Sequence, residues 1–355
     1  MTSIFDPIAF GAISCPNRIV MAPLTRNRAT MPGRVPNPLM RDYYVQRAAA
    51  GLILSEAVSV DPQGVGYPST PGCWSDEQTR GWTDVVSGVH AAGGRIMMQL
   101  WHVGRISDPQ YHDGKPPVAP SAIAAEGHVS LLRPKRPFPM PRALETDEIP
   151  GIVAAYKRGA ANAKKAGFDG VEIHGANGYL LDQFLQDSTN KRTDRYGGSI
   201  ENRARLMLEV ADACIEVWGA DRVGMHLAPR CDAHSMGDSD SAKTFGYVAS
   251  ELGKRKIAFI FARESLKEPR LGPQLRKAFG GPWIANEALT RETAIQVLAD
   301  NEADAVSFGK DFISNPDLVE RLKKNAAITP WNMATFYSEG PAGYTDYPTL
   351  AAAQV

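Results

Sequence analysis

The 355-residue sequence contains few cysteines, and their spacing offers neither a metal site nor a disulfide framework. Its four cysteines, Cys15, Cys73, Cys214 and Cys231, form no C-x-x-C pair. Zinc sites and disulfide-rich folds both show closely spaced cysteines, with histidines nearby in the case of zinc. We therefore expect no metal at the functional site, and thiols kept reduced as in the cytoplasm.

The sequence also lacks a long hydrophobic run and an excess of charge of either sign. No stretch approaches the roughly 18 apolar residues of a membrane-spanning helix, and the start, MTSIFDPIAFG, lacks the basic and apolar regions of a signal peptide. Lys plus Arg and Asp plus Glu number 39 each, so the basic footprint of nucleic-acid binding is missing. We expect a cytoplasmic protein whose partners are small molecules, with no nucleic acid and no membrane.

Eight short apolar runs recur along the chain, each followed by polar or glycine-rich residues and then by a helical pattern. Runs that are apolar on both faces are typical of parallel strands covered by helices. Length alone allows one domain or two, but eight strand-helix units predict an α/β fold, a single (β/α)8 TIM barrel over residues 1–355. The runs are RIVMAP, GLILSEAV, RIMMQLWH, GVEIHGAN, RVGMHLAP, IAFIFARE, PWIANEAL and AVSFGK.

An open doubly wound sheet is the competing architecture, but its G-x-G-x-x-G signature follows none of these runs.

Two segments fall outside the repeat of strands and helices. Residues 3–19 alternate in a way that predicts an N-terminal hairpin at the barrel floor. Residues 106–145 carry eight prolines between the third strand and the next helix. We expect this long proline-rich loop to be a lid over the site, with a solvated surface loop as the alternative.

The carboxyl ends of the strands make the active site of a (β/α)8 barrel. Here these ends carry neutral hydrogen-bonding groups and aromatic rings. His102, His174 and His226 lie on different strands, with scattered carboxylates, which is not the pattern of a metallohydrolase. The composition of these ends is typical of a site for a flat, polar-edged ligand such as a flavin.

Five motifs resemble those of the old yellow enzyme family of flavin-dependent ene-reductases. They are MAPLTR (21–26), QLWHVGR (99–105), HGANGYLLDQFLQDSTNKRTDRYGGSIENRARL (174–206), FISNPDL (312–318) and GYTDYP (343–348). The resemblance implies bound FMN, reduced by NADPH or NADH, that in turn reduces activated alkenes: unsaturated ketones and aldehydes, maleimides and nitroalkenes. One pocket would serve nicotinamide and substrate in turn, which predicts ping-pong kinetics.

The resemblance assigns catalytic roles to three residues after the fourth strand. His174 and Asn177 match the paired donors to the activating oxygen of the substrate, and Tyr179 matches the proton donor. Negative charge grows on that oxygen during hydride transfer, and losing one preplaced donor costs about 2.7–4 kcal/mol. If the segment stays extended, Asn177 and Tyr179 point to the same side, which predicts anti addition.

Further contacts follow from the resemblance position by position. Thr25 matches the hydroxyl near flavin O4 and N5, and Gln99 the side chain at the pyrimidine edge. Pro23, Leu24 and Ala57 would contribute main-chain contacts to the flavin.

Three aromatic residues match positions around the substrate. Tyr67 and Trp101 resemble the walls of the substrate pocket, and Tyr337 resembles the aromatic that covers the outer side of the flavin. Packing in the core is the alternative for all three.

The sequence departs from the family pattern at the flavin ring. His226 stands where the family usually has an arginine that faces flavin N1 and O2. Because the reference pKa of histidine is about 6.5, we expect FMN to be held more weakly, or to be harder to reduce, at alkaline pH. Arg230 is a candidate for the compensating charge.

A second departure lies at the phosphate end, where the family prefers glycine-rich backbone after strand seven and arginine after strand eight. This chain has Asn286 and Glu287, then Gly309 and Lys310. Lys310 keeps the charge without the bidentate fork of arginine, and the Glu287 carboxylate would repel a phosphate. The backbone N–H groups of Asn286 and Gly309 remain as phosphate donors.

Two other functions stay open on the sequence. Lys310 and the last two strand-end loops also fit a phosphate-binding aldolase or isomerase. The departures also fit a barrel that binds flavin or another aromatic ligand without efficient turnover. The physiological substrate, the nicotinamide preference, the stereochemical face and the choice between monomer and homodimer are left open by the sequence.

Overall fold

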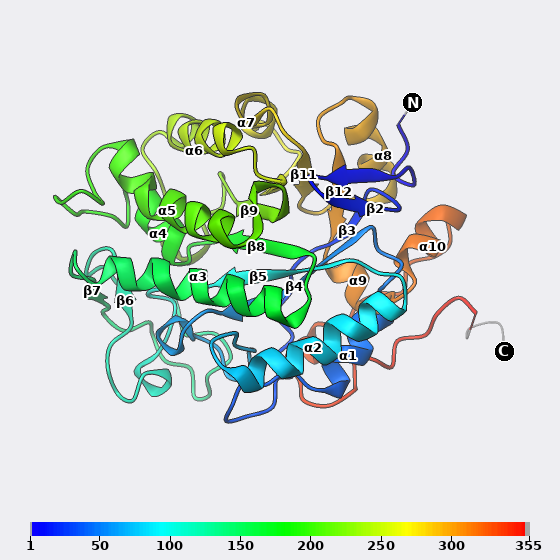
Figure 1. The fold of residues 1–355 in the computed structure, drawn as a ribbon, viewed down its shortest axis with the longest axis horizontal. Coiled ribbons are helices and arrows are strands. Elements are labelled where there is room, and N and C mark those ends of the chain that lie inside the picture. The colour runs from blue at the N-terminus through cyan, green and yellow to red at the C-terminus, as the bar shows by residue number, and fades with distance from the viewer. Residues whose placement is uncertain (1, 352–355) are drawn as a thin grey trace.

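The structure is a computed structural model that describes residues 2–351. Eight parallel strands close into a barrel in the order β3, β4, β5, β8, β9, β10, β11 and β12, and β12 pairs back onto β3 (Figure 1). All eight predicted strands are present, so the TIM-barrel prediction is confirmed. The strands are β3 (Ile19–Met21), β4 (Leu52–Ser59), β5 (Ile96–Trp101), β8 (Gly170–His174), β9 (Val223–Leu227), β10 (Phe259–Arg263), β11 (Trp283–Asn286) and β12 (Ala305–Phe308).

Helices ring the outside of the barrel (Figure 1). Helices α2, α3, α5, α6, α8 and α10 follow β4, β5, β8, β9, β11 and β12, as the helical patterns after these apolar runs predict. Helices α1, α4, α7 and α9 have eight residues or fewer and were not distinguished in the sequence. The helices are α1 (Pro38–Val45), α2 (Asp76–Ala91), α3 (Ile149–Ala166), α4 (Leu180–Leu185), α5 (Ile200–Trp218), α6 (Ser241–Arg255), α7 (Gly272–Phe279), α8 (Arg291–Ala299), α9 (Lys310–Ser314) and α10 (Leu318–Lys324). Five single 3-10 turns are η1 (Pro62–Gly64), η2 (Pro109–Tyr111), η3 (Ala220–Arg222), η4 (Ala233–Ser235) and η5 (Met333–Thr335).

The predicted N-terminal hairpin is present and fills the barrel floor. Strands β1 (Ile8–Phe10) and β2 (Ile13–Cys15) pair antiparallel. The Phe10 ring lies edge-on to Phe259 of β10, with ring centres 5.4 Å apart. Phe10 and Ile13 share an apolar cluster with Leu52 and Met97 from inside the barrel. The hairpin therefore shields the lower barrel interior from water.

The proline-rich segment 106–145 lies against the barrel mouth. It contains only the short parallel pair β6 (Val118–Ala119) and β7 (Arg142–Ala143) and the turn η2. Its buried side chains Val129, Leu132 and Phe138 cluster with Tyr67 and Trp101. The segment therefore packs on the barrel through apolar side chains, and its role as a lid stays a prediction.

Buried arginines fix the chain beyond α10 against the barrel. Arg26 donates from Nε to the Phe336 carbonyl at 3.1 Å and from Nη2 to the Gly343 carbonyl at 2.7 Å. Arg47 is fully buried and donates to the Tyr344 carbonyl at 3.4 Å, as well as to the carbonyls of Phe312 and Ile313 in α9. The C-terminal segment is thereby held beside the mouth of the barrel.

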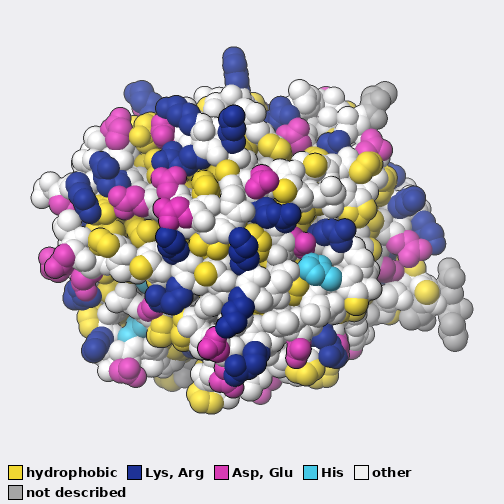
Figure 2. Space-filling model, in the orientation of Figure 1, with side chains coloured by type: hydrophobic (Ala, Val, Ile, Leu, Met, Phe, Trp, Pro, Cys, Tyr) yellow, Lys and Arg dark blue, Asp and Glu magenta, His cyan; other side chains and the backbone are white. Residues whose placement is uncertain are grey.

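The surface carries both signs of charge. Figure 2 shows basic and acidic side chains interspersed over the face in view. This agrees with the equal numbers of basic and acidic residues in the sequence, 39 of each. None of the helices within residues 2–351 has the length and apolar character needed to cross a bilayer.

The interior of the barrel changes from apolar at the floor to polar near the mouth. On β5, Met97 belongs to the floor cluster, and Gln99 lies two residues nearer the carboxyl end. Gln99 Nε2 donates to Glu172 Oε2 of the neighbouring strand β8 at 2.7 Å. Burial raises the pKa of Glu172 to about 8, and the hydrogen bond from Gln99 offsets only part of that shift. Glu172 is therefore held protonated inside the barrel at neutral pH.

This buried carboxyl makes the stability of the fold depend on pH. In the unfolded chain Glu172 loses its proton near 4.5, and in the folded barrel near 8. Between these values the folded state binds more protons, so its stability falls as pH rises. Glu172→Gln keeps an acceptor for Gln99 and removes the ionisation.

We expect the unfolding free energy of the wild type, relative to Glu172→Gln, to fall between about pH 5 and pH 8. The change amounts to several kcal/mol at most, because each unit of pKa difference corresponds to about 1.4 kcal/mol. Denaturant titrations of both proteins at the two pH values measure it. Parallel pH profiles would show that Glu172 ionises normally in the barrel.

Candidate active site

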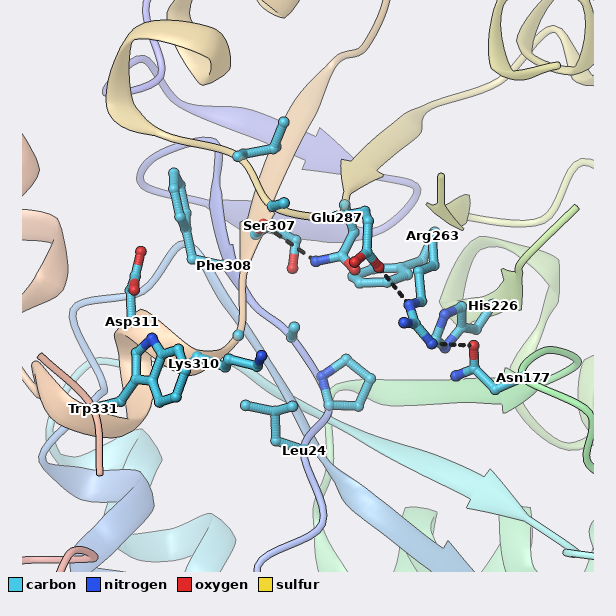
Figure 3. Close-up of a pocket in the computed structure, with 17 residues that line it drawn as sticks. Leu24, Asn177, His226, Arg263, Glu287, Ser307, Phe308, Lys310, Asp311 and Trp331 are labelled. Atoms are coloured by element: carbon cyan, nitrogen blue, oxygen red, sulfur yellow. Dashed lines mark hydrogen bonds and ion pairs between the residues drawn. The ribbon is translucent and has the colours of Figure 1, made fainter. Parts of the chain in front are cut away.

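A cavity of about 540 Å³ opens at the carboxyl ends of the strands (Figure 3), a size typical of small-molecule and cofactor sites. Its walls come from the ends of β3, β9, β10, β11 and β12 and from the segment after β8. Seven residues predicted from the sequence line it: Pro23, Leu24, Asn177, His226, Asn286, Gly309 and Lys310. The structure therefore gathers residues from distant motifs around one cavity.

Strand register sets the histidines at the mouth. His174 on β8 lies beside His226 on β9, and their rings stack with centres 5.0 Å apart and an interplanar angle of 21°. Gln99 Nε2 donates to His226 Nδ1 at 3.2 Å. With Nδ1 as the acceptor, the neutral His226 ring carries its proton on Nε2.

Both imidazoles are neutral at physiological pH. Burial lowers the pKa of His174 to about 3, with a further contribution from the charge of Arg263. Burial also lowers the pKa of His226 well below its usual value, helped by His174 and Arg263. The expectation that His226 is partly charged near pH 7 is wrong, because the mouth of the barrel is desolvated.

Several buried polar atoms at or beside the cavity have no hydrogen-bond partner within residues 2–351. His226 Nε2 and Ser307 Oγ belong to residues that line the cavity, and His174 Nδ1 belongs to the ring that stacks on His226. Buried polar groups are normally paired, so this rim is suited to a ligand with donors and acceptors along its edge, as in a flavin ring. No group of three or more side chains able to hold a metal ion occurs in the described part of the chain.

A tight turn carries the chain from β8 into α4. Asn177 has φ of 59° and Gly178 has φ of 78°, both left-handed. Gly178 N–H donates to Asp182 Oδ2 at 2.9 Å, and Gln183 Nε2 donates to the Gly178 carbonyl at 2.7 Å. The expectation of an extended segment is therefore wrong. Side chains of α4 fix the turn, which sets the directions of Asn177 and Tyr179.

Tyr179 lies among the residues expected to surround the substrate. Its ring stands edge-on to His174 at 5.0 Å and to Trp101 at 4.9 Å. Its hydroxyl lies 2.8 Å from that of Tyr67, whose ring stacks on Trp101 at 5.3 Å. Burial raises the pKa of Tyr179 well above its usual value, so the phenol keeps its proton at neutral pH.

Other predicted residues lie around this centre. Ala57 on β4 packs in the cluster that contains Tyr67 and Trp101. Tyr337, 46% exposed, lies at the outer rim, where it and Tyr67 line a second cavity of about 470 Å³ under the lid. Thr25 is partly buried in the segment after β3 and is not among the residues that line the larger cavity.

The sequence analysis missed the role of Arg263, at the end of β10. Its Nη1 donates to Asn177 Oδ1 at 3.0 Å, and its Nε binds the Glu287 carboxylate (Figure 3). Glu287 is therefore paired with a cation. Arg263 lies near the polar end of the run IAFIFARE, and this strand-end position was the signal that could have singled it out.

Arg230 does not supply a charge to the mouth. Its Nη1 donates to the Lys267 carbonyl at 2.8 Å and lies 3.7 Å from Glu264. The hypothesis that Arg230 compensates for His226 is therefore wrong, since the side chain is engaged outside the residues that line the cavity.

Comparison with known proteins identifies the family. The profile of the NADH:flavin oxidoreductase / NADH oxidase family matches residues 3–328. The chain is 41% identical over 361 residues to putative 12-oxophytodienoate reductase 4 of Oryza sativa subsp. japonica, covering 98% of this chain and 93% of that protein.

Solved structures agree with this match. Morphinone reductase in complex with tetrahydroNAD superposes with a TM-score of 0.95 at 48% identity, covering 99% of this chain and 98% of the other. The old yellow enzyme homologue from Zymomonas mobilis superposes with a TM-score of 0.96 at 45% identity, covering 98% and 100%. These matches set aside the aldolase or isomerase interpretation. The chain belongs to the NADH:flavin oxidoreductase / NADH oxidase family, that of the old yellow enzymes, and is an oxidoreductase with FMN as cofactor and a nicotinamide nucleotide as reductant.

Proposed function

We propose that this protein reduces the C=C bond of activated alkenes with NADPH or NADH as reductant, by a ping-pong mechanism. The observation that carries this proposal is the contact between the His174 and Tyr179 rings, 5.0 Å apart, beside the cavity that Asn177 and His226 line. The alternative is a barrel that binds flavin without efficient turnover, which the altered residues His226, Glu287 and Lys310 keep open.

Residues that line the cavity, together with Thr25, Ala57 and Gln99 outside its lining, would hold the cofactor. Pro23, Leu24, Thr25, Ala57, Gln99 and His226 are proposed for the ring, and Asn286, Gly309 and Lys310 for the phosphate. The unpaired His226 Nε2 and Ser307 Oγ fit such a ligand because they need partners that the described chain does not supply. When bound, FMN takes a hydride from the nicotinamide and gives one to the alkene.

His174 and Asn177 are suited to donate hydrogen bonds to the activating oxygen of the alkene. Because Arg263 donates to Asn177 Oδ1, the Nδ2 amide group of Asn177 is left as a donor. His174 is neutral and has an unpaired ring nitrogen at the mouth. Neutral donors of this kind stabilise the charge that grows on the substrate oxygen, each worth about 2.7–4 kcal/mol.

Tyr179 would supply the proton. The hydride adds to the β-carbon, the C=C π-bond breaks, and the O–H bond of Tyr179 breaks as its proton passes to the α-carbon. The Tyr67 hydroxyl, 2.8 Å away, is placed to reprotonate the phenolate. The net reaction consumes one alkene, one NAD(P)H and one proton, and yields the saturated product and NAD(P)+.

Replacing the phenol should separate the two half-reactions. Tyr179→Phe removes the proton source, and general acids of this kind contribute about 10²- to 10⁴-fold. We expect reoxidation by cyclohexenone to slow by a factor in that range, while reduction by NADPH, which needs no proton from Tyr179, stays within about twofold. Stopped-flow absorbance of each half-reaction measures this. Equal slowing of both would contradict the assignment.

Measuring turnover distinguishes an alkene reductase from a barrel that binds flavin without efficient turnover. The FMN colour should bleach with NADPH under nitrogen and return when cyclohexenone or N-ethylmaleimide is added. Initial rates over both substrates should give parallel double-reciprocal lines, because one pocket takes them in turn. Intersecting lines would refute the shared pocket. Colour that bleaches but returns with no alkene, nitro compound or quinone would favour the binder.

A further inference from the structure

Strand β10 brings a cation to the barrel mouth beside the uncharged His226. In the strand register His226 lies next to Phe261, and their ring centres are 4.6 Å apart. Arg263 follows Phe261 by two residues, so both side chains leave the same face of the strand. Arg263 therefore lies one step nearer the mouth than His226, and both line the same cavity (Figure 3).

Two acceptors from other strand ends hold Arg263 in place. Asn177 Oδ1, from the turn after β8, accepts from Nη1 at 3.0 Å, and Glu287, just beyond β11, accepts from Nε. Glu287 adopts φ of 119°, a region that only glycine enters readily. A non-glycine residue at such a position indicates that the surroundings hold it there. The ion pair with Arg263 is one interaction that does so.

The charge on Arg263 agrees with the neutral state of the His226 and His174 rings. Burial acts against the charge of Arg263, but the hydrogen bond with Glu287 and the electrostatic effects of Cys231, Glu287 and Tyr179 together raise the pKa of Arg263 above its usual value. The positive charge of Arg263 helps to keep His226 and His174 neutral. A second cation in place of His226 would face Arg263 across adjacent strands, where like charges repel.

We propose that Arg263, anchored by Glu287, supplies the positive charge of the flavin site that His226 lacks, and thereby raises the midpoint potential of the bound FMN. The proposal rests on the proposed function only in placing the FMN ring in this cavity. A cation there favours the reduced ring, which carries more negative charge, over the neutral oxidised ring. Arg263 acts through its charge and through Asn177, so it is a positioning residue.

The test compares Arg263→Gln with Glu287→Gln in FMN-loaded protein. Both substitutions break the same ion pair. If Arg263 only holds the structure together through its ion pair with Glu287, both variants shift the flavin potential in the same direction. If its charge matters, Arg263→Gln lowers the midpoint potential and Glu287→Gln, which leaves the cation uncompensated, raises it.

In Arg263→Gln we expect the ratio of the affinity for reduced FMN to the affinity for oxidised FMN to fall about tenfold or more. For a two-electron couple, a tenfold fall lowers the midpoint potential by about 30 mV. Arg263→Lys, which keeps the charge, should stay nearer the wild type. The double variant His226→Arg with Arg263→Gln returns a cation to the neighbouring strand and should recover most of the loss. Dye-linked redox titration under nitrogen measures each potential, and flavin fluorescence measures the affinity for oxidised FMN.

Shifts of the same sign in the two single variants, or an unchanged potential in Arg263→Gln, would overturn the proposal. If Arg263→Gln fails to fold, Glu287→Gln must still raise the potential for the proposal to stand. None of these measurements needs an alkene. A wild-type flavin that no alkene reoxidises would therefore refute the proposed function and leave this result intact, and a wild-type protein that binds no FMN would refute both.

Discussion

Desolvation at the mouth of the barrel is the constraint on which the site depends. The hairpin β1–β2 closes the floor of the barrel, and the proline-rich segment 106–145 packs against Tyr67 and Trp101 near the mouth. In this environment charged forms are disfavoured, so His174 and His226 are neutral and Tyr179 keeps its proton. The mouth therefore holds uncharged donors for the substrate beside the Arg263 cation, which Asn177 and Glu287 hold in place.

The same desolvation has an energetic cost. His226 Nε2 and Ser307 Oγ are buried without partners in residues 2–351, and each such group costs about 1–3 kcal/mol. Glu172 is buried as a protonated acid. A ligand that binds the folded barrel and pairs these groups offsets the cost, because binding to the native state alone stabilises it. The fold and the cofactor are thus coupled through the polar atoms at the rim.

Much of the fold was predictable because each barrel strand is buried on both faces and reads as an apolar run ending in polar residues. The hairpin was predictable for the same reason. The short helices α1 and α7 escaped notice because eight residues give a weak periodic signal. The family motifs contain eight of the fifteen predicted site residues, and the others stand elsewhere in the matched sequence. The structure brings seven of the fifteen, three of them from the motifs, to one cavity.

The errors concern properties that depend on three-dimensional surroundings. The protonation of His226 is set by burial and by Arg263, neither of which is visible in RVGMHLAP. The turn at Asn177 and Gly178 depends on Asp182, which accepts a hydrogen bond from the Gly178 N–H four residues before it. The choice between Arg230 and Arg263 as the cation at the mouth depends on contacts made after the strands end. Arg263 is the last residue of β10 and lines the cavity, whereas Arg230 lies three residues beyond β9 and donates to the Lys267 carbonyl.

The protonation state of the two stacked histidines tests this account most directly. Nitrogen-15 NMR of labelled FMN-bound protein, with His174→Asn and His226→Asn variants to assign the signals, would follow both rings between about pH 5 and pH 8. The account predicts that both rings stay neutral throughout, with the His226 proton on Nε2. A ring that gains a proton with a pKa near 6.5 would contradict it.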